Sequence, residues 1–255
     1  PSPIPRIRGG QMATLANAEK NRQRVRLGEL TENGANPGGW DAAWREGVTP
    51  WDISSSSTPV NPAFAALLSS GKLPGGSAVV PGCGSGADVL ALAAAGYKAL
   101  GVDVSPAALE AARKAGAAAT NASAGAAAFL TASFFEPLPD EPFDVGYDYT
   151  FLCALHPSMR EEWASSWARA LRPGGELVTL MYPVAEKEGG PPYAVSLSLY
   201  SDLLGAAGFT QVEEPRRLPD GECAEGRAGA EWIGRWRRPG GPPAAEVDAT
   251  RGEDP

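Results

Sequence analysis

A glycine-rich segment, residues 77–105, constrains the fold of this chain more than any other stretch. It opens with a short apolar run, residues 77–81, which is bounded by turn residues and too short for a convincing helix. Three alternate glycines follow, then a helical pattern, and then a second apolar run that ends in Asp103. The order strand, glycine turn, helix, strand and acid predicts the first half of a nucleotide-binding βαβ unit in an α/β protein.

The chemistry of this unit suits a nucleoside ligand. Glycine permits positive φ and lets a ligand lie against bare backbone, and the following helix offers unpaired N–H groups. Asp103, at the carboxyl end of the second strand, is placed to accept hydrogen bonds from two ribose hydroxyls. Two cofactors fit this loop. If the loop is G-x-G-x-x-G/A with Ala87 as its last position, it indicates a dinucleotide. If it is G-x-G-x-G, it indicates S-adenosylmethionine. A tight turn without any ligand is the third interpretation.

Composition narrows the class of protein. A chain of 255 residues with ordinary hydrophobic content predicts one α/β domain. The net charge of −8, with no basic cluster beyond the first thirty residues, argues against nucleic acid, and no apolar run is long enough for a membrane span. The cysteines are three, unclustered, and predict neither a disulfide framework nor a zinc site. A single histidine makes a His-based metal site or a catalytic triad improbable, so no metal is expected.

The two ends of the chain differ from its centre in composition. Residues 1–38 are interpreted as a flexible, solvated arm, and residues 239–255, rich in Pro, Gly, Ala and acidic residues, as a disordered tail. The catalytic domain is therefore expected at 39–238. Free cysteines favour a reducing, cytoplasmic location; the alternative is an organelle, if the basic residues before Gln11 are the remnant of a transit segment.

Three tryptophans lie in residues 39–51, GWDAAWREGVTPW. Trp40 and Trp44 are four residues apart, on one face of a short helix, and a Thr-Pro turn leads to Trp51. They either anchor an N-terminal helix on the core or wall a pocket. Indole faces attract cations, a sulfonium included, and exclude water, which favours a helical cap over a reaction site.

Turn residues set out the elements beyond Asp103. Ser105 is a suitable N-cap with Pro106 at the first helical position, predicting a helix to about Ala115. Further strands are expected at 129–132, 143–152, 176–182, from about 210, and at 232–238, the last antiparallel. Further helices are expected at 157–171 and 196–207.

Two segments lie where a doubly wound sheet places its ligands. Ser133 and Phe134 follow the third strand, where adenine would be reached. The loop 183–195, with its Gly-Gly-Pro-Pro-Tyr run, follows a strand and suits a wall on the substrate side. An alanine-rich stretch, 117–128, precedes the third strand as a loose loop.

The chain resembles a known family in a series of ordered motifs. These are G-W-x-x-x-W-x-x-G-V-T-P-W, V-P-G-C-G-x-G, G-V-D-V-S, F-D-x-x-x-D-Y, L-R-P-G-G-E-L-V-T-L-M-Y-P and G-G-P-P-Y. Together they closely resemble the plant-type halide/thiol/thiocyanate methyltransferases of the thiopurine methyltransferase superfamily, over roughly residues 39–238. The resemblance implies a Rossmann-like class I methyltransferase with a seven-stranded, mostly parallel sheet and S-adenosylmethionine as cofactor.

The resemblance also implies site residues, position by position. The residues expected to contact the cofactor are Trp40, Trp44, Trp51, Gly82, Gly84, Asp103, Ser133, Phe134 and Tyr149. At the adenine position the family carries Asp-Val where this chain carries Ser133-Phe134, so a shorter hydroxyl replaces a carboxylate acceptor. Tyr149 corresponds to the tyrosine of the family's D-Y motif.

The implied reaction is an in-line displacement at the sulfonium methyl. Since the cofactor carries the activated group, the protein supplies mainly orientation and desolvation, and a soft anion needs no base. Tyr149 and Tyr193 are expected to hydrogen-bond or pack against the acceptor, with Trp51 closing the site; for both tyrosines a core role is the alternative. His156 is interpreted as a capping or surface residue rather than a base, and Cys83 and Cys153 as small buried side chains.

We therefore expect an enzyme that methylates a halide, thiocyanate, hydrosulfide or small thiol. A larger, thiopurine-like thiol, a metalloid such as arsenite, or a phenol is the alternative acceptor on the same scaffold. An NAD-dependent dehydrogenase and a catalytically dead S-adenosylmethionine-binding protein are the alternatives of other classes. The expected partner is a small anionic or thiol substrate, and the expected state is a monomer.

Overall fold

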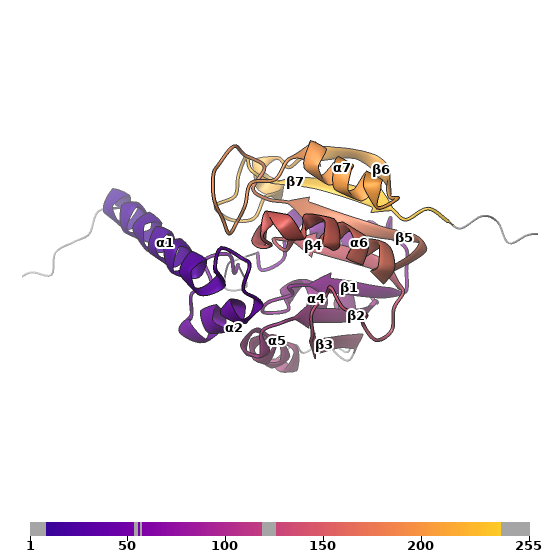
Figure 1. The fold of residues 1–255 in the computed structure, drawn as a ribbon, viewed down its shortest axis with the longest axis horizontal. Helices are drawn as coiled ribbons and strands as arrows, with labels where there is room; N and C mark the ends of the chain where they lie inside the picture. Colours follow the sequence, from indigo (N-terminus) through magenta and orange to yellow (C-terminus); the bar gives the residue numbers. More distant parts are fainter. Residues whose placement is uncertain (1–8, 54–55, 57, 119–125, 241–255) are drawn as a thin grey trace, which may run out of the picture.

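The computed structural model describes residues 9–53, 56, 58–118 and 126–240, which form a seven-stranded sheet flanked by helices (Figure 1). The strand order is β3-β2-β1-β4-β5-β7-β6, and β7 is antiparallel to both of its neighbours. This confirms the predicted fold class. The strands are β1 Ser77–Pro81, β2 Lys98–Asp103, β3 Ala127–Thr131, β4 Phe143–Tyr149, β5 Leu171–Met181, β6 Thr210–Arg217 and β7 Trp232–Arg237.

Helices cover both faces of this sheet. The α-helices are α1 Gly9–Thr31, α2 Pro37–Glu46, α3 Pro62–Ser69, α4 Ala87–Ala94, α5 Pro106–Ala118, α6 Arg160–Ala170 and α7 Leu197–Ala206. Short 3-10 helices lie at η2 Leu152–Ala154, η3 Pro157–Met159 and η4 Asp220–Glu222. One core cluster joins α3 and α4 to the sheet, and the other joins α6 and α7 to its opposite face.

The alternation of side chains along β4 shows how the two cores form. Tyr147 points to the α3 side, where its ring stacks on Phe64 with 3.6 Å between ring centroids. Asp148 points to the opposite side, where it accepts a hydrogen bond of 2.7 Å from the buried indole of Trp163 in α6. Because successive residues of a strand face opposite ways, Tyr149 shares the α3 side with Tyr147.

Several strand and helix boundaries differ from the sequence prediction, most clearly around the fourth and fifth strands. The fourth strand ends at Tyr149 rather than Leu152, since Thr150 takes a positive φ of 62° that breaks the ladder. The fifth strand begins at Leu171, which pairs with Phe143 across a bulge, rather than at Glu176. The predicted helix 157–171 is divided into η3 and α6.

The N-terminal segment also departs from the expectation of a flexible arm. Residues 9–31 form α1, and near its end Leu27 and Thr31 are fully buried. Arg26 of α1 donates two hydrogen bonds of 3.0 Å to the Glu46 carboxylate of α2. The polar composition of α1 gave no sign of these contacts. The predicted tail 241–255 and most of the alanine-rich stretch, 119–125, lie outside the described residues.

Helices α1 and α2 approach each other closely at Gly39. A Cβ at this position would lie 2.0 Å from the carbonyl oxygen of Leu30, a backbone atom that cannot move aside without shifting the helix. At the neighbouring Gly38, the nearest atom to an added Cβ is the Asn36 side-chain oxygen at 3.4 Å. Gly39 therefore sets how tightly α2 docks against α1.

We predict that Gly39→Ala separates the two helices while Gly38→Ala, its matched control, does not. Overpacking costs about 1–3 kcal/mol, which lowers the melting temperature by about 2–4 °C per kcal/mol in a chain of this size. Thermal melting and the rate of tryptic cleavage at Arg22 and Arg24 would measure it. Equal melting and cleavage of the two variants would contradict the close packing at Gly39.

Candidate active site

A cavity of 410 Å³ lies beyond the carboxyl ends of the parallel strands, beneath α1 and α2. Parallel α/β sheets bind their ligands at this edge, near the strand at which the order reverses, which is β1 here. Residues that follow β1, β2, β3, β4 and β5 all reach it. Those used below are Trp40, Trp44, Trp51, Gly82, Gly84, Asp103, Ser133, Phe134, Phe151, Cys153, Tyr182 and Arg227.

Asp103 lies at the end of β2 and is tied to the glycine loop. Its carboxylate accepts a hydrogen bond of 3.0 Å from the Gly84 N–H and one of 2.9 Å from the Ser105 N–H. Burial raises the pKa of Asp103, and these backbone donors counteract that shift. The acid is thus fixed at the cavity wall, where a ribose would present its hydroxyls.

The glycine loop leaves bare backbone between aromatic rings. Gly82 and Gly84 have φ of +57° and +52°, a region that other residues rarely adopt. An added Cβ would lie 2.6 Å from the Phe151 ring at Gly82 and 3.1 Å from the Trp44 ring at Gly84. Together with Asp103, this cradle fits an adenosyl group held against backbone rather than side chains.

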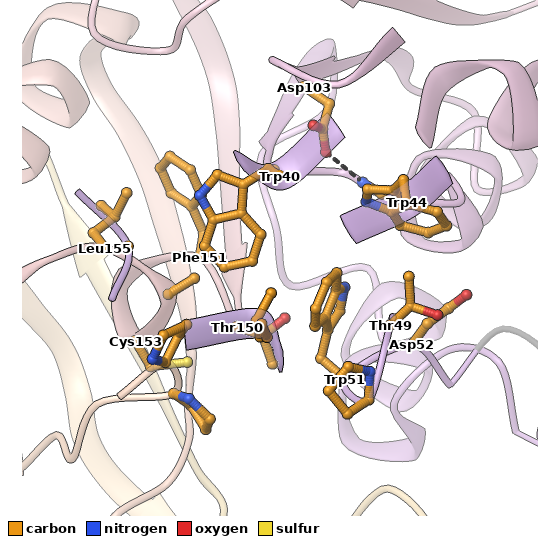
Figure 2. A pocket seen from close by; sticks show the side chains of 18 of the residues that line it. Trp40, Trp44, Thr49, Trp51, Asp52, Asp103, Thr150, Phe151, Cys153 and Leu155 are labelled. Carbon is orange, nitrogen blue, oxygen red and sulfur yellow. Dashed lines mark hydrogen bonds between the residues drawn. The ribbon is translucent and has the colours of Figure 1, made fainter. Parts of the chain in front are cut away.

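The three predicted tryptophans all line the cavity (Figure 2). Trp51 makes edge contacts with both rings of α2, at centroid distances of 5.4 Å to Trp40 and 6.1 Å to Trp44. Such edge-to-face packing holds the three indoles as one wall. The pocket interpretation of this segment, rather than simple anchoring, matches their position.

Asp41, on the helix that carries Trp40 and Trp44, fixes α2 to the N-terminus of α5. Its Oδ1 accepts hydrogen bonds of 3.0 Å from the Ala107 N–H and 2.9 Å from the Ser105 hydroxyl. The Ala107 bond is the largest cause that lowers the pKa of Asp41, followed by its bond with Arg45. Since Ser105 also binds Asp103, one network joins the tryptophan helix to the predicted ribose acid.

Ser133 and Phe134, predicted to meet adenine, both line the cavity after β3. The Ser133 hydroxyl accepts a hydrogen bond of 3.2 Å from the Phe135 N–H. Phe134 is buried, with its ring 5.9 Å from that of Phe151 and 4.6 Å from that of Trp167. This corner is therefore an apolar, ring-lined slot of the kind that accepts a flat base.

Neither of the two predicted tyrosines is among the residues that line the cavity. Tyr149 faces the α3 side because of the strand alternation, and its hydroxyl donates a 2.5 Å hydrogen bond to Glu231. Burial raises its pKa. Tyr193 donates a 2.5 Å hydrogen bond from its hydroxyl to the Asn33 carbonyl, and its N–H bonds the Cys153 carbonyl. It ties the loop after β5 to the turn between α1 and α2.

The histidine and the cysteines have structural partners. His156 is the N-cap of η3, and its Nδ1 accepts from the Ser158 N–H at 3.3 Å. Cys153 lines the cavity, where burial raises the pKa of its thiol to about 12. Burial also raises the pKa of Cys83. These thiols stay protonated at neutral pH, as expected for small buried side chains.

Asp148 supports the turn that carries Phe151 into the cavity. In addition to its bond with Trp163 it accepts a 3.3 Å hydrogen bond from the Leu152 N–H. Burial raises its pKa to about 6, and the Trp163 bond opposes that shift. Asp148 is not among the residues that line the cavity, and its hydrogen bonds hold the turn after β4.

Sequence reasoning did not find several residues of this site. Phe151 and Arg227 line it without any motif to mark them, and Asp41 lies inside the tryptophan motif as an ordinary polar residue of a helix. Lys20 and Arg24 reach the cavity from α1, which was expected to be a free arm. Of these residues, only Asp41 could have been suspected from the sequence, because it lies between two predicted contact residues, Trp40 and Trp44.

Within the described parts of the chain, no three His, Cys, Asp or Glu side chains gather into a group able to hold a metal ion. In the same residues, no helix combines the length and apolarity that crossing a bilayer requires.

The sheet order, the glycine loop and the acid after β2 define a class I S-adenosylmethionine-dependent methyltransferase. The solved structure of the 1,6-didemethyltoxoflavin-N1-methyltransferase of Burkholderia thailandensis shares this fold with a TM-score of 0.58. It covers 94% of both chains at 18% identity. A magnesium protoporphyrin IX methyltransferase from Synechocystis matches with a TM-score of 0.57 over 74% of this chain and 83% of its own, at 19% identity.

Within that class the chain belongs to the thiopurine S-methyltransferase family, whose model matches residues 35–233. It is 42% identical over 210 residues to a probable thiol methyltransferase 2 of Arabidopsis thaliana, covering 82% of this chain and 88% of the relative. It is 38% identical over 234 residues to thiocyanate methyltransferase 1 of Brassica oleracea, covering 89% and 97%. These findings confirm the family, and with it the methyltransferase class and S-adenosylmethionine as methyl donor.

We predict that Asp41→Ala loosens the tryptophan helix, whereas Arg45→Ala, which removes only the ion pair on Asp41, does not. Losing a helix cap costs about 1 kcal/mol, and an exposed pair costs less than about 0.5 kcal/mol. Calorimetric titration with S-adenosylhomocysteine should show weaker binding only for Asp41→Ala. Because the folded-state pKa of Asp41 is lowered, its stabilisation is complete above about pH 4 and is lost on further acidification. Equal effects of the two variants would contradict the capping role.

Proposed function

We propose that this enzyme methylates a small soft nucleophile: thiocyanate, a halide, hydrosulfide or a small thiol. The observation that carries the proposal is a single cavity whose wall joins the glycine loop and Asp103 to the aromatic rings of Trp51 and Phe151. Support comes from the relatives named thiol and thiocyanate methyltransferases, which share about two residues in five with this chain.

The proposed reaction is an in-line displacement. A lone pair of the nucleophile forms a bond to the methyl carbon of S-adenosylmethionine while the carbon–sulfur bond breaks, and the bonding pair stays on sulfur as S-adenosylhomocysteine. An anion gives a neutral product without any proton transfer, and a neutral thiol loses its proton to water. The products are a methyl halide, methyl thiocyanate, methanethiol or a methyl thioether.

Residues of the chain supply position and a dry environment. Asp103 holds the ribose, Gly82 and Gly84 let the adenosyl group lie against backbone, and Ser133 with Phe134 receive the base. The three tryptophans place indole faces near the sulfonium, where cation–π attraction stabilises positive charge. Excluding water activates an anionic nucleophile, because an anion becomes more nucleophilic when it loses its hydration shell. A soft anion loses that shell at low cost.

Tyr149 and Tyr193 keep a supporting place in this proposal. Tyr149 lies beneath the guanidinium of Arg227, 4.9 Å from the ring centroid, so it acts on the cavity through that side chain. Tyr193 tethers the loop after β5, which contributes Pro191 and Pro192 to the cavity wall. We also propose that the enzyme is a monomer and that it is located in the cytoplasm, and the three free cysteines support the location.

The test is headspace gas chromatography of purified protein with S-adenosylmethionine and, in separate vials, iodide, thiocyanate or hydrosulfide. Volatile methyl products above a no-enzyme control are expected, and the relative kcat/KM values identify the preferred anion. If no product forms although S-adenosylhomocysteine binds, the small-nucleophile proposal fails. Assays with a thiopurine and with arsenite then distinguish a larger acceptor from a protein without activity.

The ribose assignment has its own test, Asp103→Ala. Removing a buried acceptor of two hydrogen bonds should weaken S-adenosylhomocysteine binding by about 1–3 kcal/mol, measured by calorimetry. The matched control is Glu225→Ala, which removes a carboxylate from the same cavity without a part in the cradle. Unchanged affinity in Asp103→Ala, or an equal loss in both variants, would contradict the assignment.

A further inference from the structure

One side of α1 brings two positive charges to the cavity. The residues of this helix that line the cavity are spaced by three and four positions, which places them on one side of it: Lys20, Gln23, Arg24 and Leu27. Leu27 is buried, whereas Lys20 and Arg24 are exposed. Both cations are therefore open to a ligand that enters the cavity from solvent.

Other basic residues of α1 are paired with carboxylates, and the two at the cavity are not. Arg26 pairs with Glu46 of α2 at 3.0 Å, and Arg22 pairs with a glutamate of its own helix. No carboxylate among the described residues forms an ion pair with Lys20 or Arg24. The positive charge that α1 turns toward the cavity is thus left without a counter-charge from the described protein.

A third cation reaches the neighbourhood of Arg24 from the loop after β5. Burial lowers the pKa of Lys187, and the positive charge of Arg24 lowers it further, so the two side chains feel each other's charge. Lys187 Nζ donates a 2.5 Å hydrogen bond to the carbonyl of Pro192, a residue of the cavity wall. Because like charges repel, an anion bound beside these side chains would relieve the repulsion between them.

This positive side of the cavity contrasts with the charge of the whole chain. The net charge is −8, which repels anions from the protein as a whole. The carboxylates that line the cavity come from other elements, and they are Asp52, Asp103 and Glu225. A cleft with walls of low dielectric focuses the field of the charges that line it and concentrates ions of opposite sign. The side of the cavity next to α1 is therefore the part that attracts an anion.

We propose that Lys20 and Arg24 select anionic methyl acceptors over neutral and cationic ones, and that Lys187 adds to the same positive field. This inference rests on the proposed function and adds the residues that set its preference for charge. The cations attract the acceptor by their charge and take no part in the transfer of the methyl group. Removing their charges should therefore raise KM for an anion and leave kcat nearly unchanged.

The test compares three small thiols that differ in charge: thioglycolate, which carries a carboxylate, the neutral mercaptoethanol, and cysteamine, which carries an ammonium group. In the double variant Lys20→Gln with Arg24→Gln, KM for thioglycolate should rise about fivefold and KM for cysteamine should fall, with that for mercaptoethanol changed less than about twofold. Equilibrium dialysis of labelled thiocyanate against the enzyme saturated with S-adenosylhomocysteine should show a loss of affinity of about fivefold as well.

The matched control is Arg22→Gln with Lys98→Gln, which changes the net charge by the same amount. Arg22 is on α1 but is not among the residues that line the cavity, and Lys98 begins β2, at the sheet edge opposite the cavity. A second control, Lys20→Arg with Arg24→Lys, keeps both charges and should keep the KM values of the unaltered enzyme. Added sodium fluoride should raise KM for thiocyanate by screening, and it should do so less in the Gln variant at the cavity.

Equal KM values and equal thiocyanate affinity in the Gln variant and its charge-matched control would overturn the proposal. A parallel loss of S-adenosylhomocysteine affinity would overturn it too, by assigning the two cations to the carboxylate of the methyl donor. If the unaltered enzyme neither binds thiocyanate nor methylates any of these acceptors, the proposed function and this inference both fail. If it methylates thiocyanate and the Gln variant does so equally well, the proposed function stands and the role of Lys20 and Arg24 fails.

Discussion

The arrangement of this site depends on the hydrogen bonds that the Asp103 carboxylate accepts. One of its oxygens holds the Gly84 amide and the other holds the Ser105 amide, so the acid joins the loop after β1 to the start of α5. The Ser105 hydroxyl donates a hydrogen bond to Asp41, which lies on the tryptophan helix α2. The same few polar atoms therefore position the glycine loop, the start of α5 and the tryptophan helix α2. A change at one of these three segments is expected to affect the other two.

The cavity has different chemistry at its two ends. Toward β2 it presents a fixed acid, bare backbone and the slot at Ser133 and Phe134, which together suit an adenosyl group. Toward β5 it presents the buried guanidinium of Arg227. The three tryptophans line the same cavity.

The helical cap shows why a site of this kind needs more than its sheet. Trp40 and Trp44 reach the cavity only because α2 is docked on α1 at Gly39 and capped onto α5 by Asp41. Tyr193 adds a third tether, from the loop after β5 to the turn between α1 and α2. The cap therefore depends on contacts between segments far apart in the chain.

The sequence alone determined the sheet, the glycine loop, Asp103 and the tryptophan wall, because each of these depends on local patterns: alternation, turn chemistry and helical spacing. The ordered motifs added the family. Only the tertiary structure decided which way the side chains of β4 point, and so placed Tyr149 on the α3 side of the sheet with its hydroxyl bonded to Glu231. The tertiary structure also showed that the end of α1 packs against the rest of the protein, although its sequence is polar. It placed Arg227, from a loop without any motif, in hydrogen-bond contact with the Trp51 carbonyl. The physical reason is that burial and charge pairing at these positions arise between segments distant in sequence, which no local pattern records.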